Sequence, residues 1–163
     1  MSKFRIQPAT VTDVPLILSL IKELAEVEKF PFEITVTEED LEKSLFGEHP
    51  AAEVIIGYLG NDPVGFAAYY QTFATTTGRP GLHLDDLYVR PQFQGSGIGK
   101  KILGHLANLA KDRGCARFEW WALVSNDKAI GFYENIGARN MHELRIFRLK
   151  EQDILDVSNK LDR

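Results

Sequence analysis

A glycine-rich segment in the middle of the chain has the residue types of an anion-binding loop. Residues Gln94–Lys100 read QGSGIGK and lie between a predicted strand and a predicted helix. Glycines let a backbone approach a ligand closely, and a helix start offers unpaired N–H groups at the positive end of its dipole. A tight strand-to-helix turn would also use such glycines, but three of them beside Lys100 and Lys101 favour a phosphate site.

The spacing of the glycines distinguishes between the known types of phosphate-binding loop. A Walker A loop would need glycine at Gln94 and serine or threonine at Lys101, and this chain has neither. A serine-hydrolase elbow around Ser96 would need glycines two residues away on both sides, where Gln and Ile stand. A Rossmann loop would need its third glycine at Lys100, although Glu119 could act as its ribose-binding acid, so this loop stays as a weaker alternative.

The spacing that fits is Gln/Arg-x-x-Gly-x-Gly/Ala, which resembles the pyrophosphate loop of the GCN5-related N-acetyltransferases (GNAT), enzymes that bind acetyl-CoA. Other segments are similar to the spermidine/spermine N-acetyltransferase branch of that family, which includes diamine and thialysine acetyltransferases. These segments are Pro8–Thr10, Ile21–Ala25, Phe46–Pro50, Val64–Ala67, Tyr69–Tyr70 and Gly131–Tyr133. Because they span most of the chain, the resemblance implies one N-acetyltransferase domain over residues 1–163.

The resemblance implies direct transfer of acetyl from acetyl-CoA to a primary amine of a small cationic substrate, such as a diamine, polyamine, thialysine or lysine-like compound. A lysine-like amine has a pKa of about 10.4, so its deprotonation at pH 7 costs about 4 to 5 kcal/mol. Similarity assigns Glu28 and Asp85 to this amine, with Val27 also in substrate binding. Because side chains alternate along a strand, Asp85 and Asp86 are expected on opposite faces, and Asp85, acting through water, is the favoured acceptor of the proton.

Further residues take roles from the same resemblance. Tyr133 matches the family's general acid, which protonates the departing thiolate. The alternative without a catalytic role is that Tyr133 is an aromatic residue of the core. Where the strand splays or bulges before the loop, a backbone N–H is expected to polarise the thioester carbonyl. The expected coenzyme-binding residues are Leu87, Tyr88, Val89, Gln94, Gly95, Ser96, Gly97, Ile98, Gly99, Lys100, Asn126 and Tyr133.

One segment departs from the family pattern. The family carries a pair of glutamates before its final strand, where this chain has Met141-His142-Glu143 in a segment two residues shorter. Glu143 is the expected replacement for one of the pair in substrate binding. The resemblance also implies a homodimer with active sites at the subunit junction. A protein lysine or N-terminal acetyltransferase and a non-catalytic CoA-binding sensor remain as alternatives.

The remaining residues with reactive or aromatic side chains are expected to have structural roles. The histidines lack the spacing of a zinc site, so no metal is expected. His83 could relay a proton near Asp85, but a surface imidazole is the favoured expectation. Trp120 and Trp121 are expected on opposite faces of a strand, one in the core and one in the cleft or an interface. Cys115 is the only cysteine and cannot form an internal disulfide, so a reducing cytoplasm is expected.

Hydrophobic periodicity predicts the elements that must position these residues. Helices are expected over Val14–Ala25, from a capping box at Thr37–Asp40 to Gly47, and over Ile98–Ala110 and Asp127–Ile136. Strands are expected over Glu53–Leu59, Val64–Gln71, His83–Val89, Ala116–Leu123 and Leu144–Leu149, with a surface loop at Thr75–Gly81. This order predicts an α/β protein of GNAT fold, with a mixed, mostly antiparallel twisted sheet, splayed at its centre and flanked by helices on both faces.

The composition of the chain limits the classes of molecule that it is expected to bind. The 163 residues carry a net charge of -4 and are 44% hydrophobic, which favours one globular domain with a real core. This charge does not suit a general nucleic-acid binder and favours cationic small molecules. Because no apolar run approaches the length of about 18 residues that spans a bilayer, no membrane partner is expected.

Overall fold

The computed structural model describes residues 3–161. By its internal contacts the chain forms two compact units, Met1–Trp121 and Ala122–Arg163. Each unit has its own helices, and the sheet belongs to the first. The single domain that the length indicates stays a prediction.

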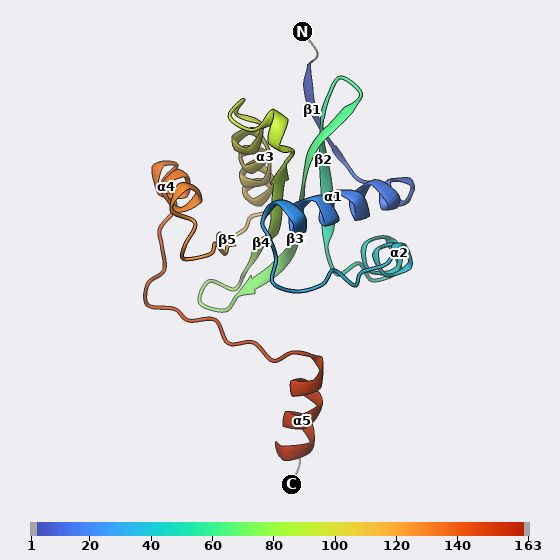
Figure 1. The fold of residues 1–163 in the computed structure, drawn as a ribbon. Coiled ribbons are helices and arrows are strands. Elements are labelled where there is room, and N and C mark those ends of the chain that lie inside the picture. The colour runs from blue at the N-terminus through green and yellow to red at the C-terminus, as the bar shows by residue number, and fades with distance from the viewer. Residues whose placement is uncertain (1–2, 162–163) are drawn as a thin grey trace. The chain divides into compact units, whose positions relative to one another are not determined.

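The first unit is built on a five-stranded sheet in the order β1-β2-β3-β4-β5 (Figure 1). Its strands are β1 (Phe4–Pro8), β2 (Glu53–Leu59), β3 (Asp62–Ala74), β4 (Arg79–Val89) and β5 (Arg117–Trp120). The first four strands pair antiparallel with their neighbours, and β5 lies parallel to β4. The expected mixed, mostly antiparallel sheet is therefore confirmed.

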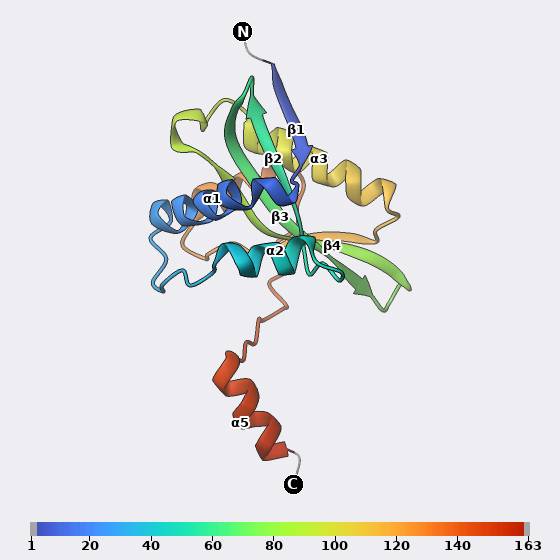
Figure 2. The same ribbon diagram turned by 90° about the vertical axis from the view of Figure 1, so that its right-hand side faces the viewer.

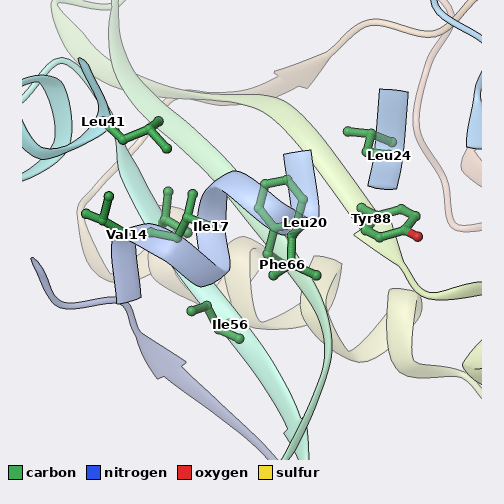
Figure 3. Close-up of a cluster of buried hydrophobic side chains, with 9 residues drawn as sticks. Val14, Ile17, Leu20, Leu24, Leu41, Ile56, Phe66 and Tyr88 are labelled. Atoms are coloured by element: carbon green, nitrogen blue, oxygen red, sulfur yellow. The ribbon is translucent and has the colours of Figure 1, made fainter. Parts of the chain in front are cut away.

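Helices cover both faces of this sheet (Figure 2), as expected. On one face α1 (Val14–Val27) and α2 (Glu38–Phe46) pack on alternate residues of β2, β3 and β4. The apolar residues of α1 recur every three or four positions, so they form one stripe that buries itself on the sheet (Figure 3). On the other face lies α3 (Ile98–Asp112), whose Ile102 and Leu106 are fully buried.

The sequence and the structure differ along the β3–β4 hairpin. The expected loop at Thr75–Gly81 shrinks to a turn, because the two strands continue pairing as far as Ala74 and Arg79. Backbone pairing needs no hydrophobic periodicity, so a Thr-rich, Gly-containing segment can still extend a hairpin. Two short 3-10 helices, η1 (Val11–Asp13) and η2 (Pro91–Phe93), precede α1 and the glycine loop.

The second unit contains α4 (Asp127–Asn135) and α5 (Glu151–Leu161). The strand expected over 144–149 is not formed, and Leu144, Ile146 and Phe147 are exposed. A strand needs a partner edge for its N–H and C=O groups, which alternation of residue types alone does not provide. No helix was expected after residue 149, yet α5 begins there, and Lys150 N donates to Asp153 Oδ2 at 3.1 Å. Within residues 3–161, no helix is long and apolar enough to cross a membrane.

Candidate active site

The glycine loop joins the end of β4 to the start of α3. Gln94 Nε2 donates to the carbonyl of Val89 at 2.9 Å, and Ser96 Oγ donates to the carbonyl of Phe93. Gly95 and Gly97 have φ angles of 77° and 81°, in the left-handed region that favours glycine. These contacts hold the loop against the end of the strand.

The first turn of α3 is open to an anion. Gly97 is the N-cap, and no side chain caps the helix. The first N–H groups of a helix have no partner within it, so here they remain available at the positive end of the helix dipole. Ile98 is 5% exposed and anchors the turn, while Lys100 is exposed beside it. The geometry fits the diphosphate site expected from the sequence.

Strand β4 leaves one edge unpaired next to the loop. In the described part of the chain, β5 pairs with β4 only over Gly81–Leu84. Arg90 N donates toward β3, to the carbonyl of Val64 at 2.9 Å. Because N–H directions alternate along a strand, the N–H groups of Leu87 and Val89 point to the open edge. This edge of β4 is open because β5 ends at Trp120, and it carries backbone donors; the expected splay of two strands stays a prediction.

A β-bulge lies in β4 at the two aspartates. Ala68 pairs with Asp86 and Tyr69 with Leu84, so Asp85 is an extra residue in β4. A bulge interrupts the regular alternation on which the expected opposite faces of Asp85 and Asp86 rest, so that expectation stays a prediction. Asp85 is exposed and Asp86 is largely buried. Burial, and then the negative charges of Asp85 and Glu28, raise the pKa of Asp86 to about 6.

Glu28 comes from the end of α1. It is the C-cap residue of that helix, and its N–H donates to the carbonyl of Leu24 at 2.9 Å. Partial loss of water raises the pKa of the Glu28 carboxyl. Val27, just before it, is 47% exposed. Since its charge acts on Asp86, Glu28 completes a group of three carboxylates with Asp85 and Asp86, which we call the acidic cluster.

An ion pair ties α1 to the strand that carries the other two carboxylates. Arg90 donates through Nε and Nη2 to the two oxygens of Glu23, at 2.9 and 2.8 Å, and through Nη1 to the carbonyl of Pro63 at 2.8 Å. The Arg90 guanidinium holds the pKa of the Glu23 carboxyl below its usual value. The sequence gives no sign of this pair, because nothing in the spacing links residues 67 positions apart.

The remaining expected residues lie in the second unit. Asn126 is the N-cap of α4, where its Oδ1 accepts from Ala129 N at 3.2 Å. Tyr133 is half-buried on α4, and Glu143 is exposed and forms an ion pair with Arg139. Their roles toward coenzyme and substrate stay predictions.

His83 differs from its expected environment. It is 6% exposed, and its ring centroid lies 4.9 Å from those of both Tyr70 and Trp121. The surface imidazole expected from the sequence is therefore wrong. The apolar neighbours of His83 in Leu82-His83-Leu84 were the available signal of a buried strand. Trp120 instead packs on Phe118, so the two tryptophans do contact different partners.

The arrangement combines acid–base chemistry with a backbone site for an anion and a carbonyl. In the part of the chain that the structure describes, no group of three or more His, Cys, Asp or Glu side chains is placed to hold a metal ion. Carboxylates, backbone donors and an open helix start are instead the groups that β4 and its neighbours bring together.

These features define an acyltransferase of the GNAT class, and the acetyltransferase (GNAT) family model matches residues 19–138. The chain belongs to this family of N-acetyltransferases, which use acetyl-CoA. It is 34% identical to a thialysine N-epsilon-acetyltransferase of Sus scrofa, over 98% of this chain and 100% of that protein. It is 33% identical to a spermidine/spermine N(1)-acetyltransferase-like protein of Homo sapiens, over 97% of this chain and 24% of that protein.

A solved structure is also similar. An integron cassette protein from the mobile metagenome of V.cholerae superimposes with a TM-score of 0.79 and 26% identity, over 97% of this chain and 98% of its own. This similarity agrees with the GNAT fold that the sheet and its helices show.

Proposed function

We propose that this N-acetyltransferase transfers acetyl directly from acetyl-CoA to a primary amine of a small cationic acceptor, in a ternary complex. The acceptor class rests on the relatives named for thialysine and for spermidine/spermine. The observation that carries the proposal is the layout of β4. Asp85 and Asp86 of the acidic cluster, the outward N–H groups of Leu87 and Val89, and the open start of α3 follow one another along the chain, and Glu28 joins the cluster from the end of α1.

The acceptor side works by charge. The acidic cluster attracts an ammonium ion, and a carboxylate then takes a proton so that the nitrogen becomes a nucleophile. Asp85 is exposed, so water can reach its carboxylate, and we keep the proposal that it acts through a water molecule. Asp86, with its pKa of about 6, is ionised at neutral pH but is a stronger base than an ordinary aspartate. We assign ammonium binding to Glu28 and Asp85, and a share of the proton transfer to Asp86.

The coenzyme side works by backbone contacts. The N–H groups at the start of α3 and in the glycine loop bind the diphosphate, and Lys100 adds a positive charge. The Leu87 and Val89 N–H groups hold the pantetheine arm and the thioester carbonyl, whose developing negative charge they stabilise. Tyr133 protonates the departing thiolate, and Asn126 contacts the coenzyme.

Other parts of the proposal rest on family resemblance. Val27 and Glu143 contribute to the acceptor site, and the protein forms a homodimer. The single cysteine, Cys115, separately favours a reducing cytoplasm as the place where it acts. Acetylation of a protein lysine or N-terminus is the alternative activity, and a CoA-binding sensor is the alternative without catalysis.

Two measurements test the proposal. Titration calorimetry should detect heat with acetyl-CoA, and a panel of diamines, polyamines, thialysine, lysine and peptides should show CoA release with a small amine. Tyr133→Phe should then lower kcat about 100-fold, in the range for loss of a general acid. Wild-type turnover in that variant would remove Tyr133 as the acid. Binding without turnover on any amine would favour the sensor, and turnover on peptides alone would favour the protein acetyltransferase.

A further inference from the structure

Three aromatic rings gather on the sheet beside the acidic cluster. Tyr70 on β3 and His83 on β4 lie directly opposite each other in the register, and their ring centroids are 4.9 Å apart at an interplanar angle of 30°. Trp121, just after β5, meets the His83 ring edge-on at 70°, with centroids 4.9 Å apart. We call these residues the aromatic ledge. Trp121 is 53% exposed, so the ledge presents a ring to solvent.

The ledge and the acidic cluster occupy the same face of the sheet. Phe66 and Ala68 pack toward α1, and Tyr70 continues that alternation along β3. Asp86 pairs with Ala68 and His83 with Tyr70, so both face the same way. The negative charge of Asp85 contributes to the raised pKa of Tyr70, after the larger effect of burial, which agrees with their closeness.

The spacing between ledge and cluster suits a short molecule. Three residues along a strand span about 10 Å, and a bulge shortens that distance. A nitrogen held by Asp85 and Asp86 would therefore leave the rest of its molecule over the His83 and Trp121 rings. The acid–base steps proposed above do not use this part of the site.

We propose that the aromatic ledge binds the body of the acceptor and selects primary amines that carry an aromatic ring on a short alkyl linker. This inference rests on the proposed acetyl transfer and specifies its acceptor class. The ammonium group meets the acidic cluster, and the ring of the acceptor stacks against Trp121 and the edge of His83.

The distribution of charge on this face of the sheet favours an acceptor with an aromatic ring over an acceptor with a second ammonium group. The three carboxylates lie at one end. At the ledge, Glu119 lies opposite His83 in the register, but its carboxylate is paired with Arg117 at 3.2 Å. A second ammonium would have only a half-exposed ring to interact with, where cation–π attraction is weak. An aromatic ring instead gains offset or edge-to-face contact and buries apolar area.

The experiment compares acceptors in the full-length enzyme. The readout is kcat/KM for 2-phenylethylamine divided by kcat/KM for 1,4-diaminobutane, measured as CoA release. We expect this ratio to exceed about 10 in the wild type and to fall about tenfold in Trp121→Leu, the range for loss of one apolar contact in a specificity pocket. Trp120→Leu is the matched control, because Trp120 packs on Phe118 away from the ledge, and it should leave the ratio unchanged.

The outcomes separate this inference from the proposed function. A wild-type ratio of about 1 or less, or an equal fall of the ratio in the two tryptophan variants, overturns the aromatic ledge while leaving acetyl transfer in place. No turnover with either amine, despite acetyl-CoA binding, counts against the proposed function itself. Tyr70→Leu provides a second test if Trp121→Leu is unstable in thermal melts, and the same fall in the ratio is expected.

Discussion

Asp86 combines burial with negative neighbours, and this combination makes its charge sensitive to pH near neutrality. Its pKa is raised to about 6, first by desolvation and then by Asp85 and Glu28. A base must be ionised to accept a proton. We therefore expect kcat/KM for the acceptor to rise with pH through about 6.

The variant Asp86→Asn tests this assignment. It should lower kcat/KM about 100-fold at pH 7.5, in the range for a general base, and remove the inflection near pH 6. Asp112→Asn on α3 is the matched control, since Asp112 is exposed. An inflection near pH 6 that persists in Asp86→Asn would assign it to another group.

We expect the Asp86 carboxyl to lower the stability of the fold at the pH values where it is ionised. Its folded pKa lies above its ordinary value of 3.8, so its protonated form stabilises the fold below about pH 4, and that stability is lost as the pH rises through 6. Asp86→Asn should therefore raise the free energy of unfolding by about 3 kcal/mol at pH 8 and by only about 1 kcal/mol at pH 4.5, since one pKa unit corresponds to about 1.4 kcal/mol. Urea unfolding at the two pH values measures this, and a pH-independent difference would contradict it.

The environment of a residue could be predicted where the local sequence pattern determines it. It could not be predicted where the pairing of strands determines it. The residue types and order of the glycine loop predict a turn between a strand and a helix, and the structure has that turn between β4 and α3. The relation of Asp85 to Asp86 depends on a bulge, which forms only when β3 pairs with β4. The burial of His83 depends on rings that arrive from two other segments, Tyr70 and Trp121. Such non-local contacts leave no periodic signal in one sequence.

At the scale of elements, the Glu23–Arg90 pair fixes α1 against the end of β4. Its two side chains are 32% and 23% exposed and share two charged hydrogen bonds. Arg90→Ala should lower the free energy of unfolding by about 1 to 2 kcal/mol, since it leaves Glu23 partly buried without its partner.

Denaturant unfolding measures the effect of Arg90→Ala, and Asp112→Asn again serves as the control. Asp112 and its partner Lys111 are 71% and 73% exposed, so loss of that pair should change stability by less than about 0.5 kcal/mol. Equal effects of the two variants would contradict a special role for the α1–β4 pair.

The start of α3 makes a second prediction at this scale. Gly97 has a φ of 81°, so Gly97→Ala should cost about 1 to 2 kcal/mol of stability and weaken acetyl-CoA binding. In the middle of the same helix, a methyl group added at Gly104 would meet no neighbouring atom within 4 Å. Gly104→Ala should therefore stabilise by up to about 1 kcal/mol and leave the affinity for acetyl-CoA unchanged. Calorimetric titration of both variants compares the affinities.

Most elements of the first unit could be predicted because their hydrophobic stripes or capping residues are local. The capping box of α2 at Thr37 and Asp40 forms as expected, with Asp40 N donating to Thr37 Oγ1 at 3.2 Å. The segment 144–149 shows the limit of this reasoning. Its alternation resembles a strand, but strand formation requires a partner that one sequence does not identify.

At the scale of the whole molecule, the second unit exposes apolar side chains over the same segment. Ile146 is 58% and Phe147 91% exposed. Large exposed apolar groups on a protein surface often mark an association site. This supports the proposed homodimer, and sedimentation should give about twice the 18.4 kDa of one chain.

Phe147→Asp should shift the protein toward the monomer. Phe73→Asp is the matched control, because Phe73 is also exposed, at 61%, but lies in the β3–β4 hairpin. A wild-type species of 18.4 kDa at micromolar concentration would contradict the homodimer.

The unpaired stretch of β4 also affects how the protein behaves before it meets its coenzyme. Unsatisfied N–H and C=O groups on an edge strand are a template for another chain, so the ligand-free protein is exposed to aggregation at the place where it works. A pantetheine arm bound along this edge would take the place of a neighbouring strand. It would then prevent another chain from pairing there. The supply of coenzyme would then govern how much native protein survives, as well as how fast it turns over.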